Sequence, residues 1–108
     1  MLPFSVRAAS AGAAFLIAGS GFAGEYQITQ KDKKFSQAQL TVKVGDTVNF
    51  KNEDPYSHNI FSLSNTKTFD LGSYPKGQSK PVTFDKPGTV EIECAIHPEM
   101  RLIVEVKK

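Results

Sequence analysis

The chain has 108 residues, of which 40% are hydrophobic and 22% are charged, and it contains one cysteine, two histidines and two methionines. This length suits one ordinary domain rather than two, and the composition excludes a chain that is disordered throughout. The formal net charge of +2 is too small for a protein that binds the phosphate backbone of nucleic acids, and a single cysteine excludes an internal disulfide.

Residues 1–23 have the layout of a secretory signal peptide. Arg7 precedes an apolar run, and Gly21 and Ala23 stand at the −3 and −1 positions of a small-x-small cleavage site. A membrane anchor would need about 20 consistently apolar residues, whereas this run is shorter and is diluted by serines and glycines. We therefore expect cleavage after Ala23, export to the periplasm without stable membrane insertion, and one mature domain over residues 24–108.

The mature chain predicts short strands joined by turns and no helix. Alternating apolar and polar residues, the period of a half-buried strand, predict strands at Tyr26–Gln30, Leu40–Val44, Thr47–Phe50, Ser57–Leu63, Lys80–Phe84, Thr89–Cys94 and Leu102–Val106. Turns are predicted at Lys31–Lys34 and Asp85–Gly88, and the two glycines and one proline within Phe69–Gly77 predict mostly loop there. About seven or eight strands at this spacing predict an all-β fold, an antiparallel sandwich with Greek-key connections.

Four residues of the mature chain have side chains that favour metal binding. The only cysteine and methionine are Cys94 and Met100, and the two histidines are His58 and His97. Three of the four follow one another as Cys-x2-His-x2-Met, and His58 stands at the head of a predicted strand. Cysteine, two histidines and a weakly bound methionine are the ligand set of a blue-copper electron-transfer site. A tight loop that carries Pro98 can turn His97 and Met100 back toward Cys94, so the spacing fits one copper ion.

Each of these residues also has a structural explanation when it is taken alone. A lone cysteine at an apolar strand position is usually a buried thiol, a lone histidine usually has ordinary polar partners, and a lone methionine usually packs. A free thiol in an oxidising compartment, however, tends to pair or oxidise unless something protects it. Because Cys94 is the only thiol, the joint assignment to a copper site explains it better than four separate explanations do.

Three other classes of protein remain open at this point. A periplasmic copper carrier could use the same four ligands, although such sites are usually more open and richer in methionine. An enzyme with Cys94 as nucleophile would need a third orienting group and an oxyanion loop, for which the sequence gives no clear candidate. Structural zinc is disfavoured because methionine is not a usual zinc ligand. We expect a copper protein that is not an enzyme.

These residues and motifs resemble a small cupredoxin of the plastocyanin, pseudoazurin and amicyanin group. The similarity covers essentially the whole mature chain. It includes the Leu40–Phe50 strands with their Val44-Gly45-Asp46 turn, the Ser57-His58-Asn59 segment, and the Asp85–Gly88 turn before the cysteine strand. The short Cys94–Met100 loop, with a proline directly after its histidine, is most similar to that of amicyanin.

The resemblance implies the role of each site residue. His58, Cys94 and His97 become the strong equatorial ligands of one type 1 copper ion, and Met100 becomes its long axial ligand. Asn59 matches a family position whose side chain braces the cysteine-bearing loop by hydrogen bonds. The implied function is the shuttling of single electrons, with copper alternating between Cu(II) and Cu(I) and the outer edge of His97 as the electron port.

The resemblance also implies the kind of partner. Ile96 and Pro98 flank His97 with apolar surface, which suits a brief encounter with a redox protein, and transient redox complexes use small interfaces. A c-type cytochrome or a periplasmic dehydrogenase would be such a partner, and we expect a monomer that binds no nucleic acid. The lysines at 31, 33 and 34 could form a basic docking patch for an acidic partner, although a solvated turn is the simpler interpretation.

Overall fold

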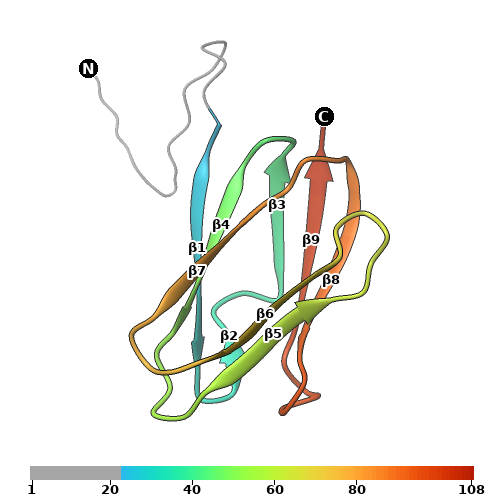
Figure 1. Ribbon diagram of the computed structural model, residues 1–108. Coiled ribbons are helices and arrows are strands. Elements are labelled where there is room, and N and C mark those ends of the chain that lie inside the picture. The colour runs from blue at the N-terminus through green and yellow to red at the C-terminus, as the bar shows by residue number, and fades with distance from the viewer. Residues whose placement is uncertain (1–22) are drawn as a thin grey trace, which may run out of the picture.

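Nine β-strands and no helix make up the described part of the chain, residues 23–108 of this computed structural model (Figure 1). The strands are β1 (Glu25–Lys31), β2 (Lys34–Phe35), β3 (Gln39–Lys43), β4 (Thr47–Asn52), β5 (His58–Ser62), β6 (Phe69–Tyr74), β7 (Ser79–Thr83), β8 (Gly88–Cys94) and β9 (Arg101–Lys107). The predicted signal peptide, apart from Ala23, lies outside the described residues. Within the described residues, no helix has the length and apolar character that a membrane span would need.

The strands form two sheets that face each other, which confirms the predicted sandwich. One sheet has the order β2-β1-β4-β7 and the other has the order β3-β9-β8-β5-β6. The pairing is not antiparallel throughout, because β1 runs parallel to β4 and β3 runs parallel to β9. Strands β3 and β4 follow each other in sequence but lie in different sheets, so each pairs with a strand from elsewhere in the chain. A period of two shows which face of a strand is buried but says nothing about the direction of its neighbour.

Strand β6 corrects the prediction of a mostly loop segment after Phe69. Phe69–Tyr74 forms a six-residue strand that pairs with β5, and the register between the two strands shifts between Asn59 and Phe61. Gly72 has a φ of +72°, a left-handed conformation that glycine adopts without steric cost. The glycine therefore belongs to an irregularity inside the strand and does not end it. Beyond this irregularity, Tyr74 pairs with His58, so β6 supports the start of β5.

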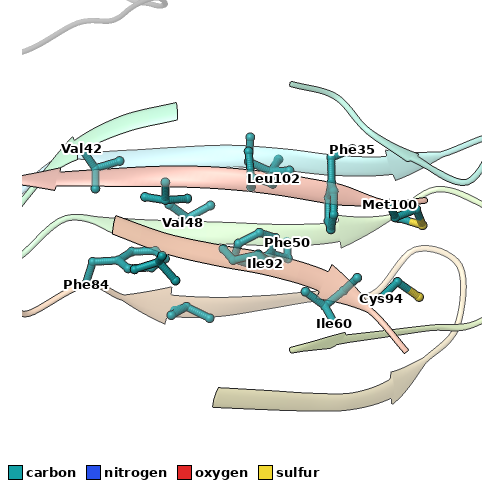
Figure 2. Close-up of a cluster of buried hydrophobic side chains, with 14 of the residues drawn as sticks. Phe35, Val42, Val48, Phe50, Ile60, Phe84, Ile92, Cys94, Met100 and Leu102 are labelled. Carbon is teal, nitrogen blue, oxygen red and sulfur yellow. The ribbon is translucent and has the colours of Figure 1, made fainter. Parts of the chain in front are cut away.

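The core lies between the two sheets and reaches the end of the sandwich where β8 stops (Figure 2). Along β8 and β9 every second side chain is buried, which gives the inward set Val90, Ile92, Cys94, Leu102, Val104 and Val106. The same alternation brings Cys94 inward at the last position of β8, and Met100 is buried just before β9 begins. Figure 2 shows both sulfur atoms at the same end of the core. The period of two thus places candidate ligands as well as core residues.

Tyr74 is expected to stabilise this end of the core through its hydroxyl group. The hydroxyl accepts a hydrogen bond from the amide of Gln30 at 2.9 Å and donates one to the carbonyl of Phe50 at 3.0 Å. Tyr74→Phe removes both bonds and leaves buried polar groups unpaired, so the free energy of unfolding should fall by about 1–3 kcal/mol. Urea denaturation of the variant at neutral pH measures this loss, and a variant as stable as the wild type would contradict it.

The same residue predicts an alkaline effect of known sign. Burial, opposed by the hydrogen bond from Gln30 and reinforced by the nearby Cys94, raises the pKa of Tyr74 to about 12. The unfolded chain releases this proton at an ordinary pKa of about 10, so the contribution of Tyr74 to stability is complete below that pH and is lost as the pH rises toward 12. Denaturation curves of the wild type and of Tyr74→Phe should therefore converge between those two pH values. A stability gap that stays constant would exclude this assignment.

Candidate metal centre

The candidate ligands come from three neighbouring segments at one end of the sandwich. His58 is the first residue of β5 and Cys94 is the last residue of β8, and these two strands pair so that Ile60 lies opposite Cys94. His97 lies in the loop between β8 and β9, and Met100 lies at the end of this loop. The amide of Met100 donates to the carbonyl of His97 at 2.9 Å, which makes the loop as tight as the sequence predicts.

Three donor atoms of these residues converge on one point. The Cys94 sulfur lies 3.6 Å from Nδ1 of His58 and 3.8 Å from Nδ1 of His97, and the two ring nitrogens lie 3.2 Å apart. The centre of a triangle with these sides is about 2 Å from each atom, which is close to the distances at which thiolates and imidazoles bind a d-block metal ion. One thiolate and two imidazoles with a nearby thioether are a donor set that suits copper. The residues present therefore fit the implied metal.

Burial differs among the four candidate ligands. His58, Cys94 and Met100 are buried, whereas His97 is only half-buried. Cys94 is a free and buried thiol. Among the four, His97 is thus the residue that links the interior of the site to solvent.

A buried carboxylate fixes the tautomer of His58. Oδ2 of Asp54 lies 2.6 Å from Nε2 of His58, and a carboxylate can only accept, so Nε2 carries the proton. The other ring nitrogen, Nδ1, is then free to direct its lone pair toward Cys94 and His97, as a ligand histidine requires. Asp54 was not predicted as part of the site because Asn-Glu-Asp-Pro is typical of a turn. The available signal was an acid four residues before a candidate ligand.

Asp54 also holds the turn between β1 and β2. Its carboxylate accepts hydrogen bonds from the amides of Asp32 at 2.6 Å and Lys33 at 3.1 Å. These two turn residues have φ values of 55° and 60°, so both are left-handed, and the predicted turn at Lys31–Lys34 is confirmed. Burial alone would raise the pKa of Asp54, but the hydrogen bonds from His58 and from the two amides outweigh it and hold the pKa below its usual value.

Tyr56 makes a second contact with the site that was not predicted from the sequence. Its ring centroid lies 5.5 Å from that of His58 and 5.7 Å from that of His97, so one side chain packs against both imidazoles. Tyr56 is 39% exposed and therefore forms part of the surface beside His97. Loop residues of this kind show no periodicity, so the contact becomes visible only in the folded protein.

The structure corrects the role predicted for the side chain of Asn59. This side chain donates a hydrogen bond to Asp70 on β6 at 3.1 Å, while the Asn59 carbonyl accepts from the amide of Ala95 at 3.0 Å. Alternation along β5 explains the difference, because His58 and Ile60 point into the core and the residue between them is turned outward. The cysteine-bearing loop is braced by the backbone of Asn59 and not by its amide group.

Asp54→Asn is expected to weaken both the fold and metal binding. An amide NH2 in place of Oδ2 would face the N–H groups of Lys33 and His58, which should lower the free energy of unfolding of the metal-free protein by about 1–3 kcal/mol. If His58 changes tautomer to accept from the new amide, its Nδ1 carries a proton, and copper affinity should fall by about 10–100-fold. Urea denaturation and competition with a copper chelator measure the two effects.

Asp70→Asn is the matched control for this substitution. Asp70 is an exposed carboxylate that accepts from Asn59 and from the amide of Gly72 but has no contact with a candidate ligand. Its substitution should change stability by less than about 0.5 kcal/mol and leave copper affinity unchanged. Equal effects of the two substitutions would show that Asp54 does not position His58.

Comparisons with known proteins agree with this geometry. A family model described as copper binding proteins of the plastocyanin/azurin family matches residues 22–107. The methylamine utilization protein MauL of Methylorubrum extorquens is 28% identical over 85 residues, which cover 78% of this chain and 75% of that one. The solved structure of a Cu(I) amicyanin variant is 30% identical with a TM-score of 0.68, over 75% of this chain and 80% of that one.

A larger copper enzyme also contains a region with this fold. The copper-containing nitrite reductase from Thermus scotoductus matches with a TM-score of 0.71 and 27% identity, over 76% of this chain. The chain spans only 22% of the length of that enzyme, so the match concerns one part of it.

Proposed function

Because this chain belongs to the plastocyanin/azurin family of copper binding proteins, we propose that it is a periplasmic relay for single electrons. It is a small cupredoxin similar to amicyanin, and it binds copper and is not an enzyme. In the proposal, His58, Cys94 and His97 would hold one copper ion strongly and Met100 would hold it weakly. When bound, copper supplies a one-electron couple between Cu(II) and Cu(I).

The convergence of three donor atoms within 3.2–3.8 Å of one another is the observation that carries this proposal. Asp54 keeps the lone pair of His58 directed inward, and the buried ends of β5 and β8 hold His58 and Cys94 in place. A site held by strands and buried side chains changes little when its charge changes. That property favours rapid electron transfer, because little rearrangement has to accompany the transfer.

The surface around His97 favours electron exchange at this residue. Ile96 is 56% exposed and Pro98 is exposed, and Tyr56 packs against the His97 ring. These residues form a small apolar surface over the half-buried imidazole. Transient redox complexes use interfaces of this limited size, below about 1,200 Å² in total.

The periplasmic location and the partners belong to the proposal as well. The signal-peptide pattern of residues 1–23 supports export. A c-type cytochrome or a dehydrogenase remains the proposed kind of partner, and the name of one relative, a methylamine utilization protein, supports the dehydrogenase. We propose that the protein works as a monomer, since a relay must leave its electron port open to successive partners.

A copper carrier is the competing function, and it would have to release its ion. Three of the four proposed ligands are buried, so release would require local opening of the fold, which favours the relay. Protein-film voltammetry of the copper-loaded protein, with an excess of the Cu(I) chelator bathocuproine disulfonate, separates the two functions. A relay should give a reversible one-electron wave and keep its copper over repeated cycles. Loss of the metal at the first reduction would instead support a carrier, and the absence of any wave would contradict the relay.

A further inference from the structure

Lysine side chains gather at the end of the sandwich that holds the candidate metal centre. A surface hollow of about 220 Å³ is lined by Lys31, Lys51 and Lys76, together with Asn52, Glu53 and Gly77. These residues come from the ends of β1 and β4 and from the loop between β6 and β7. Figure 1 shows that this loop and the β1–β2 turn lie at the same end as the β8–β9 loop, which carries His97.

The hollow and the surface around His97 are linked through Tyr56. Lys33 places its Nζ atom 5.9 Å from the centroid of the Tyr56 ring, and that ring lies 5.7 Å from the ring of His97. Asn52, which lines the hollow, donates a hydrogen bond to the carbonyl of Tyr56 at 2.8 Å. The lysines and the proposed electron port are therefore parts of one surface, joined through Tyr56.

The lysine-bearing turn is held rigidly relative to the metal centre. The same Asp54 carboxylate accepts from the amides of Asp32 and Lys33 and from the ring of His58. A partner that binds a surface which is already ordered loses less conformational entropy than one that must order a mobile loop. The backbone of this turn is therefore ordered, while its lysine side chains are exposed and accessible to a partner.

The charge of this region is positive although the whole chain is close to neutral. Five lysines, at positions 31, 33, 34, 51 and 76, lie in this region with Asp32, Glu53 and the buried Asp54, and the exposed Glu99 lies on the loop beside His97, so the lysines outnumber the carboxylates by five to four. The ion pair between Lys51 and Glu53 is 3.8 Å long and both side chains are more than one-third exposed, so it neutralises little of the local field. A local cluster of one sign attracts a partner of the opposite sign over about one Debye length.

We propose that a basic surface made of Lys31, Lys33, Lys51 and Lys76 docks an acidic face of the partner protein, with Tyr56 at its border to His97. This inference rests on the proposed electron relay and adds the chemistry of the partner to it. Carboxylates on the partner pair with the lysines. The apolar surface at His97 then contacts the partner, which shortens the distance for electron transfer. Because the pairs are exposed, the encounter is brief and weakens with salt.

The test compares two double variants with the same change in total charge. Lys31→Glu/Lys76→Glu alters the basic surface, whereas Lys43→Glu/Lys107→Glu alters two exposed lysines that pair in register on β3 and β9 at the opposite end of the sandwich. The Cu(I) protein is oxidised at low salt by hexacyanoferrate(III), an anion that represents the acidic partner, and by the cation tris(phenanthroline)cobalt(III). The rates are measured by stopped flow and repeated with a deca-glutamate peptide as a competitor.

The proposal predicts a site-specific change of opposite sign for the two reagents. With hexacyanoferrate(III), Lys31→Glu/Lys76→Glu should react about fivefold more slowly than the wild type and the control pair less than about twofold more slowly. With the cobalt complex the first variant should react faster, and deca-glutamate should slow the anion reaction of the wild type and of the control pair but not that of Lys31→Glu/Lys76→Glu. Equal changes in both variants, or no competition by the peptide, would overturn the proposal, as would tight binding of a double-stranded DNA fragment by the basic surface.

A second measurement separates this inference from the relay on which it rests. Hexacyanochromate(III), a paramagnetic anion that accepts no electron here, should broaden the amide signals of Lys31–Lys34 and of Lys76 and Gly77 in the Cu(I) protein, and leave those of Lys43 and Lys107 sharp. Failure of both oxidants with the wild type would refute the relay while this map still reports on the basic surface. Broadening spread evenly over both ends would refute the basic surface alone.

Discussion

Cys94→Ala is expected to abolish the intense visible absorption that Cu(II) produces when it binds the wild-type protein. Such a band arises from charge transfer between a thiolate and copper, and Cys94 carries the only sulfur of this kind in the chain. Its sulfur lies 3.6–3.8 Å from Nδ1 of the two histidines, so one metal ion between the three atoms would contact all of them. Without the thiolate, the two imidazoles can still bind copper, but the complex should be pale.

The affinity of Cys94→Ala for copper should fall together with the intensity of the absorption band. Loss of a contact that supports a metal ligand typically lowers metal affinity by about 10–100-fold. Removal of a strong ligand itself should therefore lower the affinity for copper by about 100-fold or more. Spectrophotometric titration with Cu(II), together with a chelator competition, measures both quantities. A Cys94→Ala protein that keeps the band would exclude Cys94 as a ligand.

Ile60→Val is the matched control for this experiment. Ile60 is fully buried and lies opposite Cys94 in the β5–β8 pairing, but it has no ligand atom. The substitution should cost about 0.5–1.5 kcal/mol of stability and leave the band intact. Loss of the band in this variant would show that the site depends on packing of the strands more than on the thiolate.

The part of the site that is local in sequence could be predicted from the sequence. Cys94, His97 and Met100 lie within seven residues, and the alternation of β8 shows that Cys94 points inward. His58 could be added because it was the only other histidine and because the Ser57-His58-Asn59 segment resembles that of a small cupredoxin, whereas nothing in its local spacing placed it near the loop. The small number of candidate ligand residues therefore identified the site in the sequence, whereas in the folded protein the distances between their donor atoms identify it.

The supporting contacts could not be predicted, because they join segments that are distant in the chain. Asp54 connects the β1–β2 turn to His58 across more than 20 residues, and the sequence shows only a polar turn at each place. The parallel pairing of β1 with β4 and of β3 with β9 depends on which sheet each strand joins. Strand β6 was missed because a glycine at a left-handed position indicates a loop and an irregular strand equally well.

Copper loading is expected to raise the melting temperature of the protein by about 16–32 °C. A ligand that binds only the folded state at about a thousandfold excess over its dissociation constant stabilises it by about 4 kcal/mol, and each kcal/mol shifts the melting temperature of a domain of this size by about 4–8 °C. The effect should be large here because His58 and Cys94 are 36 residues apart in sequence, so the unfolded chain does not hold them together. Differential scanning calorimetry of the anaerobic Cu(I) protein and of the metal-free protein measures the shift.

Two variants make this experiment specific to the proposed ligands. Cys94→Ala should lose most of the shift, since its affinity for copper is reduced, whereas Lys107→Glu should keep it, because Lys107 lies at the other end of β9 from Met100. Some binding of copper by the unfolded chain through Cys94 and His97 lowers the shift without removing it. Equal melting temperatures with and without Cu(I) in the wild type would mean that the three donor atoms do not form one metal site, and a full shift in Cys94→Ala would place the copper elsewhere.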